Sequence, residues 1–462
     1  TVSPYTMIAE CLMYSSDSLA EYYRVRLHRQ VRVSTVPFWV AFWVLVQFPN
    51  LAVPTRYPHV TAVGVLLFFC LDFSSKSSNR LDASAAKWVF LLLVYAVLAT
   101  GIALVSHPSW TSFFPTEQLL TKYYYWLSLW FLFLVTFLGS KRLDSLSWFV
   151  SIQNVHWVTI IASFVVIGFG LDATLLSANP HFSYSRFAAF DQEPSVAGYR
   201  FLFIMWTNLY LIVGFRARRA WSSVQLLAGT VLFFYVASKA ALSSLLVASI
   251  VSLAFVAYRS LRHRRTSRIR TTLGLLSVML PIGWWFFTSS YWRYLVWSAA
   301  LSEDTSSYTR LSLLLSSAFL FLRNPWGIGF VYNVPLAESL QETMGAIGSV
   351  NSEIRSYLGD LSENISRISP KSGLMNLVLV QGVFVWIPII RGAKAIYRGQ
   401  KHLPTSIQAL NLLFLVSFGA YFILADAYLP FYVYCGAGLG AILALPRPRG
   451  TTAPVRARLD LS

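Results

Sequence analysis

Long apolar runs, separated by short polar segments, constrain this chain more than any other feature of its sequence. Most runs approach the roughly 20 residues that a helix needs to cross a bilayer. Of the 462 residues, 56% are hydrophobic and 12% are charged, whereas a soluble domain carries about 25% charged residues. Backbone polar groups inside lipid need internal partners, and the runs are too long for barrel strands. The sequence therefore predicts an all-α polytopic membrane protein.

The apolar runs divide the chain into twelve predicted spans. They lie at 34–53, 58–72, 85–105, 121–138, 154–171, 196–214, 222–237, 240–258, 272–289, 373–390, 405–425 and 428–446. This reading gives three regions: an N-terminal segment over 1–33, a transmembrane domain over 34–446 and a C-terminal tail over 447–462.

The positions of the basic residues predict the orientation of these spans. With the N-terminus in the cytoplasm, 26 of the 37 lysines and arginines lie before span one or after an even-numbered span, if Lys87 at the start of span three is counted with them. Such segments face the cytoplasm according to the positive-inside rule, so both termini are expected there. The net charge of +18 is thus explained without nucleic acid. Three scattered cysteines predict neither a disulfide framework nor a metal site.

The remaining basic residues oppose this sorting rule, because the topology places them at the outer face. They are Arg56, Lys122, Arg186, Arg200, Lys239, Arg293, Arg310, Arg323, Arg355, Arg367 and Lys371. Two long outer segments, 172–195 and 290–372, hold most of them. The second contains "RLSLLLSSAFLFLRNPWGIGF", whose apolar run is too short to span and predicts a helix at the interface or in a cavity. We expect some of these cations to bind an anion.

The stretch "SYSRFAAFDQEPSVAGYR", residues 183–200, brings Arg186, Asp191, Glu193 and Arg200 close together in sequence. Pro194 is typical of the first turn of a helix, so Asp191 and Glu193 are either helix caps or members of a site. Arg200 lies about one turn inside a span. An arginine there faces a polar cavity or a partner, or extends to the membrane surface.

Three other outer segments each bring a basic residue to the same face. Lys239 lies in "SKAALSSLL", Arg310 lies in "SSYTRLSLLL", and Lys371 follows Arg367 in "RISPKSG". Such residues are often solvated or paired with nearby acids, but their convergence favours a phosphate or pyrophosphate ligand. The sequence shows no Walker loop, HExxH motif or Cys/His cluster, so we expect neither a cofactor nor a metal. Cations can stabilise a leaving pyrophosphate directly.

In segment order the chain resembles the O-antigen polymerase and ligase superfamily, membrane glycosyltransferases of the GT-C class. "SRFAAFDQEPSVAGY" resembles the family's Arg-Phe-x-Gly-x-Phe segment with its following proline, and "SKAALSSLL" resembles its Ser-Arg-Gly turn. "TRLSLLLSSAFLFLRNPWGIGF" resembles an Arg…Asn-Pro-x-x-Gly-x-Gly segment, and "PKSGLMNLVLVQGVF" resembles the ligase span that opens with His-Asn. We call these four stretches the landmark segments.

The resemblance implies a donor glycan on undecaprenyl pyrophosphate, and an acceptor that is another lipid-linked glycan in polymerases or lipid A–core in ligases. It implies metal-independent transfer at the outer face of a bacterial inner membrane, with a chain-length regulator protein as a further partner. It places Arg186, Lys239 and Arg310 on the family's basic positions, and Lys371 on or beside the ligase histidine. Arg200 joins them as a candidate pyrophosphate ligand.

Three departures from the family pattern guide the choice of activity. Ala188 replaces a glycine, Lys239 replaces an arginine, and no histidine stands near Lys371. The missing histidine favours a polymerase over a ligase and leaves the general base open, with Glu193 as the first candidate and Asp191 as the second. From another class, a lipid-linked glycan flippase is the alternative.

Overall fold

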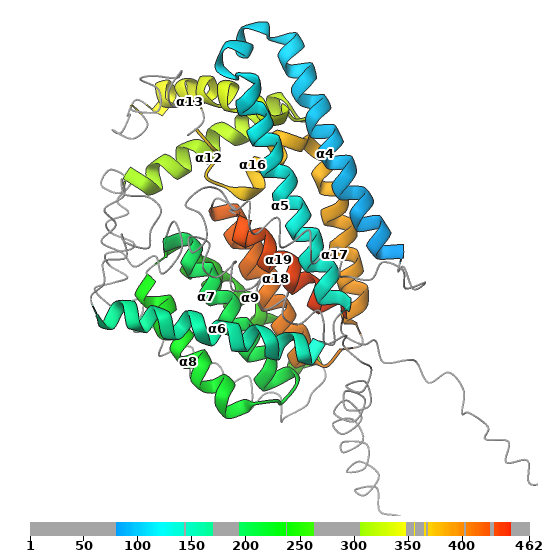
Figure 1. Cartoon of the computed structure of the whole chain (residues 1–462), viewed down its shortest axis with the longest axis vertical. Coiled ribbons are helices and arrows are strands. Elements are labelled where there is room, and N and C mark those ends of the chain that lie inside the picture. The colour runs from blue at the N-terminus through cyan, green and yellow to red at the C-terminus, as the bar shows by residue number, and fades with distance from the viewer. Residues whose placement is uncertain are drawn as a thin grey trace, which may run out of the picture.

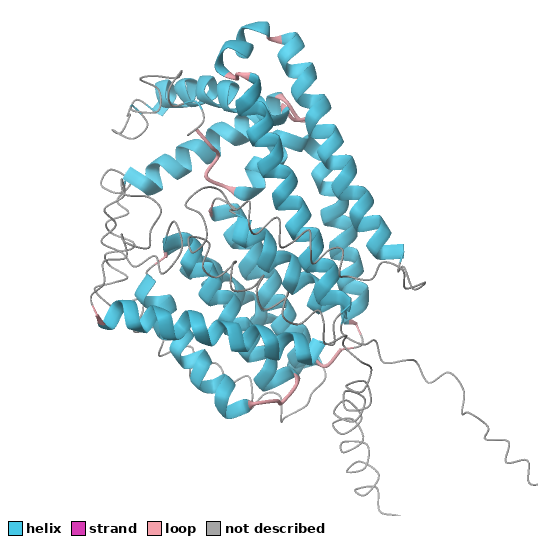
Figure 2. Ribbon diagram, viewed as in Figure 1, coloured by secondary structure: helices cyan, strands magenta, loops and turns pink. Residues whose placement is uncertain are grey.

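The described part of the chain is almost entirely helical. The computed structural model describes residues 80–142, 145–169, 194–236, 238–262, 305–347, 355, 365, 368–401, 403–425 and 429–444. Helices follow one another through these ranges, and none of the described residues forms a strand (Figure 2). The predicted spans 34–53, 58–72 and 272–289 lie outside them.

Sixteen helical elements make up the described residues (Figure 1). The first eight are α4 (Arg80–Ser106), η2 (Pro108–Phe113), α5 (Thr116–Arg142), α6 (Ser145–Gly168), α7 (Pro194–Leu209), η4 (Tyr210–Gly214), α8 (Arg219–Val236) and α9 (Lys239–Arg262). The others are α12 (Thr305–Arg323), η5 (Gly329–Val331), α13 (Asn333–Ile347), α16 (Gly373–Gln381), η7 (Gly382–Val385), α17 (Trp386–Gln400), α18 (Thr405–Leu424) and α19 (Leu429–Ala444).

Seven helical stretches in the described ranges are long and apolar enough to cross a membrane. They are Ser84–Ser106, Thr116–Ser140, Trp148–Gly168, Val196–Gly214, Ala240–Arg259, Gly373–Gln400 and Thr405–Leu424. α8 does not meet these criteria, and α19 contributes only a shorter apolar helix, Pro430–Ala444. The chain is therefore an all-α, membrane-embedded protein, while the count of twelve spans stays a prediction.

The buried apolar side chains form two large cores that meet at α5. One core joins α6, α7, α8, α9, α18 and α19. The other joins α4 with η2, α12, η5, α13 and α16. α5 contributes Leu129, Leu132 and Val135 to the first core and Trp126 and Trp130 to the second. This helix therefore holds the two halves of the helical assembly together.

α5 and α19 pack with their backbones in close contact. A Cβ atom on Gly436 would come within 2.5 Å of the carbonyl oxygen of Phe133, and one on Gly440 would overlap the carbonyl oxygen of Phe137. These glycines are four residues apart, the spacing that lets membrane helices approach closely. The sequence "CGAGLGA" thus supplies a smooth face on which α5 rests.

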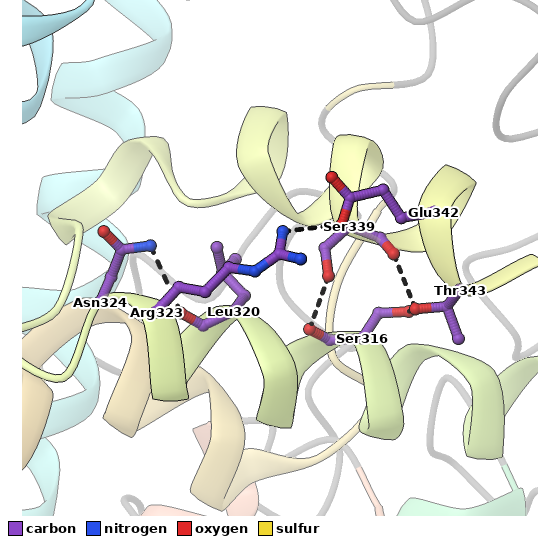
Figure 3. Close-up of polar contacts among 7 residues, drawn as sticks. All are labelled: Ser316, Leu320, Arg323, Asn324, Ser339, Glu342 and Thr343. Carbon is purple, nitrogen blue, oxygen red and sulfur yellow. Dashed lines mark hydrogen bonds and ion pairs between the residues drawn. The ribbon is translucent and has the colours of Figure 1, made fainter. Parts of the chain in front are cut away.

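α12 and α13 run across the direction of α4 and α5 and pack against each other (Figure 1). Polar groups join them: Ser316 donates a 3.1 Å hydrogen bond to Thr343, and Ser339 donates one of 3.0 Å to the carbonyl of Ser316 (Figure 3). Arg323 and Glu342 form an exposed ion pair at 2.7 Å. α12 is not among the candidate membrane spans, as the short apolar run predicts.

We expect Gly440→Leu to destabilise the fold, because a larger side chain must separate α19 from the backbone of α5. Overpacking of this kind costs about 1–3 kcal/mol. The melting temperature of the detergent-purified protein should fall, with a smaller monodisperse fraction in size-exclusion chromatography. Gly419→Leu on α18 is the matched control, since a Cβ there meets nothing within 4 Å. Equal melting temperatures in the two variants would contradict the proposed contact.

Candidate functional site

Two of the landmark segments meet where the first turns of α7 pack on the start of α9. A Cβ atom on Gly198 would lie 2.7 Å from the Cβ of Ser238 and 2.8 Å from that of Ala241. Only glycine allows this approach. It places the backbone of α7 at Gly198 directly against the side chains of Ser238 and Ala241 in "SKAALSS", whose Lys239 is the first residue of α9.

Arg200 projects into the protein from α7 and is fully buried. It therefore does not extend to the membrane surface, which was one of the alternatives for this residue. Its guanidinium acts electrostatically on His156 of α6, a second fully buried residue. The His156 ring meets Phe203 edge-on, with 5.9 Å between ring centroids. A buried arginine in a span is costly and is characteristic of functional interiors.

His156 was not a candidate from the sequence. Neither ring nitrogen has a hydrogen-bond partner among the described residues, although the residue is fully enclosed. The available signal was a single ionisable residue within the apolar run "VHWVTIIASFVVIG". That signal is weak, because only the packing of α7 against α6 brings Arg200 near it.

The other two landmark segments also contact each other. The turn "NPWG" after α12 fits into a break in the predicted tenth span. Ile328 N–H donates a 2.7 Å hydrogen bond to the carbonyl of Leu379, and Val383 N–H donates one of 2.8 Å to that of Pro325. The Tyr95 hydroxyl of α4 donates to the carbonyl of Trp326. The turn thereby connects α4 to the interrupted helix.

Two glycines permit this insertion. Gly327 has φ +85° and Gly382 has φ +61°, in the left-handed region that L side chains avoid. A Cβ on Gly327 would lie 2.5 Å from the nitrogen of Gly382, and one on Gly382 would overlap the carbonyl group of Trp326. The two backbones therefore pass each other without an intervening side chain.

The tenth span departs from the uninterrupted run predicted at 373–390. It consists of α16, the 3₁₀ turn η7 and α17, and it continues to Gln400. At the break, Gln381 is fully buried, and neither its amide nitrogen nor its amide oxygen has a hydrogen-bond partner among the described residues. Non-helical backbone at membrane depth is tolerated where protein or a cavity surrounds it.

Lys371 lies two residues before the first residue of α16, in a left-handed backbone conformation with φ +53°. Ser372 caps the helix by accepting a 3.4 Å hydrogen bond from Met375 N–H. Gly373 N–H donates a 2.9 Å bond to the carbonyl of Ala425, at the end of α18. Since α18 packs along α9, Gly373 connects the two pairs of landmark segments.

Two of the cations that the sequence predicts at the outer face have protein partners that explain their positions. Lys122 of α5 donates to Asn333 Oδ1 at 2.6 Å and to the carbonyl of Phe330 at 3.2 Å. Its ammonium lies 4.4 Å from the centroid of the Phe114 ring, while Arg323 pairs with Glu342. Anion binding is not needed to account for Lys122 and Arg323.

The predicted site residues are described to different degrees. Arg310 is half-buried on α12, which packs against α16. Arg186, Asp191 and Glu193 lie outside the described residues, although α7 begins at Pro194, as the sequence predicts. That these cations and acids line one pocket stays a prediction. In the described ranges, no three His, Cys, Asp or Glu residues form a group that could hold a metal ion.

Comparison of the sequence with models of known protein families and with curated proteins finds no match. The resemblance to the O-antigen polymerase and ligase superfamily therefore rests on the landmark segments alone.

We expect Gly382→Ala to loosen the contact between the "NPWG" turn and the broken helix. A left-handed conformation costs a non-glycine residue about 1–2 kcal/mol, and the added methyl group overlaps the carbonyl of Trp326. Limited proteolysis of the purified protein should cleave the 305–372 region faster. Gly392→Ala, at a site on α17 where a Cβ meets nothing within 4 Å, is the control. Unchanged cleavage in Gly382→Ala would rule out this contact.

Proposed function

We propose that this protein is a polymerase of lipid-linked oligosaccharide repeats at the outer face of a bacterial inner membrane. The observation that carries the proposal is the pairing of the landmark segments. The contact at Gly198 joins the first two, and the contact between Gly327 and Gly382 joins the other two. The hydrogen bond from Gly373 to Ala425 links the pairs. Segments far apart in sequence thus become neighbours, as a shared site requires.

In the proposed reaction, a hydroxyl oxygen of the acceptor glycan attacks the anomeric carbon of the donor. A new C–O bond forms while the bond to undecaprenyl pyrophosphate breaks, and the electron pair leaves with the pyrophosphate. A carboxylate, Glu193 or Asp191, takes the proton of the attacking hydroxyl. Arg186 keeps that carboxylate ionised in the resting state.

Cations supply the stabilisation of the leaving group in this mechanism. Arg186 and Arg310 can each bind pyrophosphate oxygens through two parallel N–H donors. Lys239 and Lys371 add point charges from the starts of α9 and α16. Arg200 contributes from the interior, where a charge acts more strongly than in water. Preorganised positive charge of this kind stabilises a departing anion.

The position of Lys371 supports a polymerase over a ligase. In the resembling ligases, a histidine stands at or beside this place, and here the residue is a lysine held in a left-handed conformation. A lysine ammonium has three donors and no acceptor, so this side chain suits the orientation of pyrophosphate better than the removal of a proton. The base is then assigned to the acids that precede α7.

A lipid-linked glycan flippase is the second candidate function, and the break in the tenth span favours it. Transporters often form their substrate sites on discontinuous helices near the middle of the membrane. Here, however, the break between α16 and α17 is occupied by the "NPWG" turn of the same chain. A flippase changes no covalent bond, so product analysis separates the two functions.

Arg186→Ala and Arg310→Ala should each leave membrane insertion intact but yield only unpolymerised, single-repeat glycan, because the leaving pyrophosphate loses a bidentate partner. Glycan length is read on a gel from cells that express each variant. Arg323→Ala is the matched control, since its exposed pair with Glu342 contributes little to stability. Wild-type chain lengths in both test variants would refute the site assignment.

Purified protein in detergent, supplied with one lipid-linked repeat unit, distinguishes the candidate reactions. A polymerase lengthens the glycan without lipid A–core, whereas a ligase requires lipid A–core. A flippase leaves the glycan unchanged under these conditions, because it makes and breaks no covalent bond.

Glu193→Gln should lower the rate of glycan extension by about 10²–10⁴-fold, the usual contribution of a general base. Initial rates with the purified enzyme and a saturating lipid-linked substrate measure this loss. Asp191→Asn should then have a much smaller effect. If Asp191→Asn shows the larger loss, the base is Asp191, and wild-type rates in both variants would exclude this acid pair.

A further inference from the structure

A basic hollow lies at the opposite end of α7 from the landmark contacts. It has a volume of about 610 Å³ and is lined by Asn154, Arg218, Arg219, Ala220 and Trp221. Asn154 lies in α6, Arg218 directly precedes α8, and the other three lining residues are the first three of α8. No acid is among them, so the charge of this hollow is positive.

The backbone that leads into α8 is held in an uncommon conformation. Arg216 and Arg218 both have left-handed backbones, with φ of +52° and +48°, which is costly for long side chains. Arg218 also donates a 3.0 Å hydrogen bond from Nη1 to Asn154 Oδ1 of α6. This hydrogen bond holds Arg218, one of the two arginines that line the hollow, against α6.

A network of buried amides behind the hollow keeps α6 and α8 in place. Gln153 donates to Asn208 Oδ1 at 2.9 Å and to the Ser222 hydroxyl at 2.7 Å. Gln225 donates to the carbonyl of Gln153 at 2.8 Å. Buried side-chain hydrogen bonds therefore join α6, α7 and α8 next to the residues that line the hollow.

An exposed apolar surface begins at the hollow and continues along α8. The ring centroids of Trp157 and Trp221 lie 4.6 Å apart, and Trp221 is 51% exposed. Val224, Leu227 and Val231 follow on the same helix, and each is at least half exposed. Cations, an aromatic pair and an apolar stripe thus follow one another, in the order of a phospholipid's headgroup, interfacial region and acyl chain.

This end of the helices also gathers other basic residues. A Cβ on Gly214 would lie 3.1 Å from Ile407 of α18, and Arg259 of α9 lies 3.5 Å from Gln408. The ends of η4 and α9 therefore adjoin the start of α18. The sequence predicts this as the cytoplasmic face, where anionic lipids attract clustered cations.

We propose that the hollow between α6 and α8 binds the phosphate of an anionic phospholipid, whose acyl chain lies along the exposed stripe of α8. Arg218 and Arg219 bind the phosphate oxygens, and Asn154 orients Arg218. Trp221 packs against the glycerol region. This site is separate from the proposed polymerase site and does not depend on that function.

The test uses the full-length purified protein in nanodiscs that contain phosphatidylcholine and phosphatidylglycerol, with retained lipid counted by native mass spectrometry. The wild type should retain phosphatidylglycerol in preference to phosphatidylcholine. The variant Arg218→Asn/Arg219→Gln removes both charges, and asparagine tolerates the left-handed backbone. Its affinity for phosphatidylglycerol should be about 30-fold weaker, the loss expected for two surface cations.

The control variant Lys394→Gln/Arg398→Gln removes two charges from α17, away from the hollow, and should retain the lipid as the wild type does. Equal retention by the hollow variant and the wild type, or an equal loss in the control, would overturn the proposal.

Inorganic phosphate is the third probe. If millimolar phosphate alone raises the melting temperature of wild type but not of the hollow variant, the site takes free phosphate rather than lipid. Should the double variant fail to fold, Arg219→Gln alone provides the same comparison.

Discussion

A helix interrupted inside a membrane must find new partners for the backbone groups that it frees, and in this protein a turn of the same chain provides them. The "NPWG" turn enters the break between α16 and α17, where Ile328 and Val383 form backbone hydrogen bonds across the contact. The two backbone segments can pass this closely because Gly327 and Gly382, both in left-handed conformations, have no side chains. The long segment that contains α12 is therefore built into the helical assembly, and the position of α12 relative to α16 depends on this contact.

The cations that the sequence predicts at the outer face have different surroundings in the structure. Lys122 binds the carbonyl of Phe330 and the side chain of Asn333, so it secures the chain just beyond the turn. Arg200 of α7 is instead buried inside the protein, where it interacts electrostatically with His156. The basic residues that oppose the positive-inside rule therefore include both structural anchors and candidate ligands. The burial of each side chain and its hydrogen-bond partners are needed to tell the two groups apart. The proposed glycan chemistry rests on the second group.

The helical class, the start of α7 at Pro194 and the non-spanning α12 could all be predicted from the sequence, because each follows from local apolar length or from a proline. The break at Gly382 could not, since one glycine in an apolar run also suits an intact membrane helix. The interaction of His156 with Arg200 could not be predicted either, because it depends on how α6 packs against α7. The pairs of landmark segments likewise depend on contacts between residues far apart in the chain.

The glycine face of α19 has a consequence for the order in which the protein is assembled. The ribosome completes α5 long before α19 emerges, so α5 enters the bilayer without the neighbour that its carbonyl-lined side fits. Until α19 is synthesised, the side of α5 that contacts the glycines of α19 stays uncovered, although α5 belongs to both cores. Closure of the two described cores is thus a late event in biogenesis, because α5 lacks this neighbour until α19 has been synthesised.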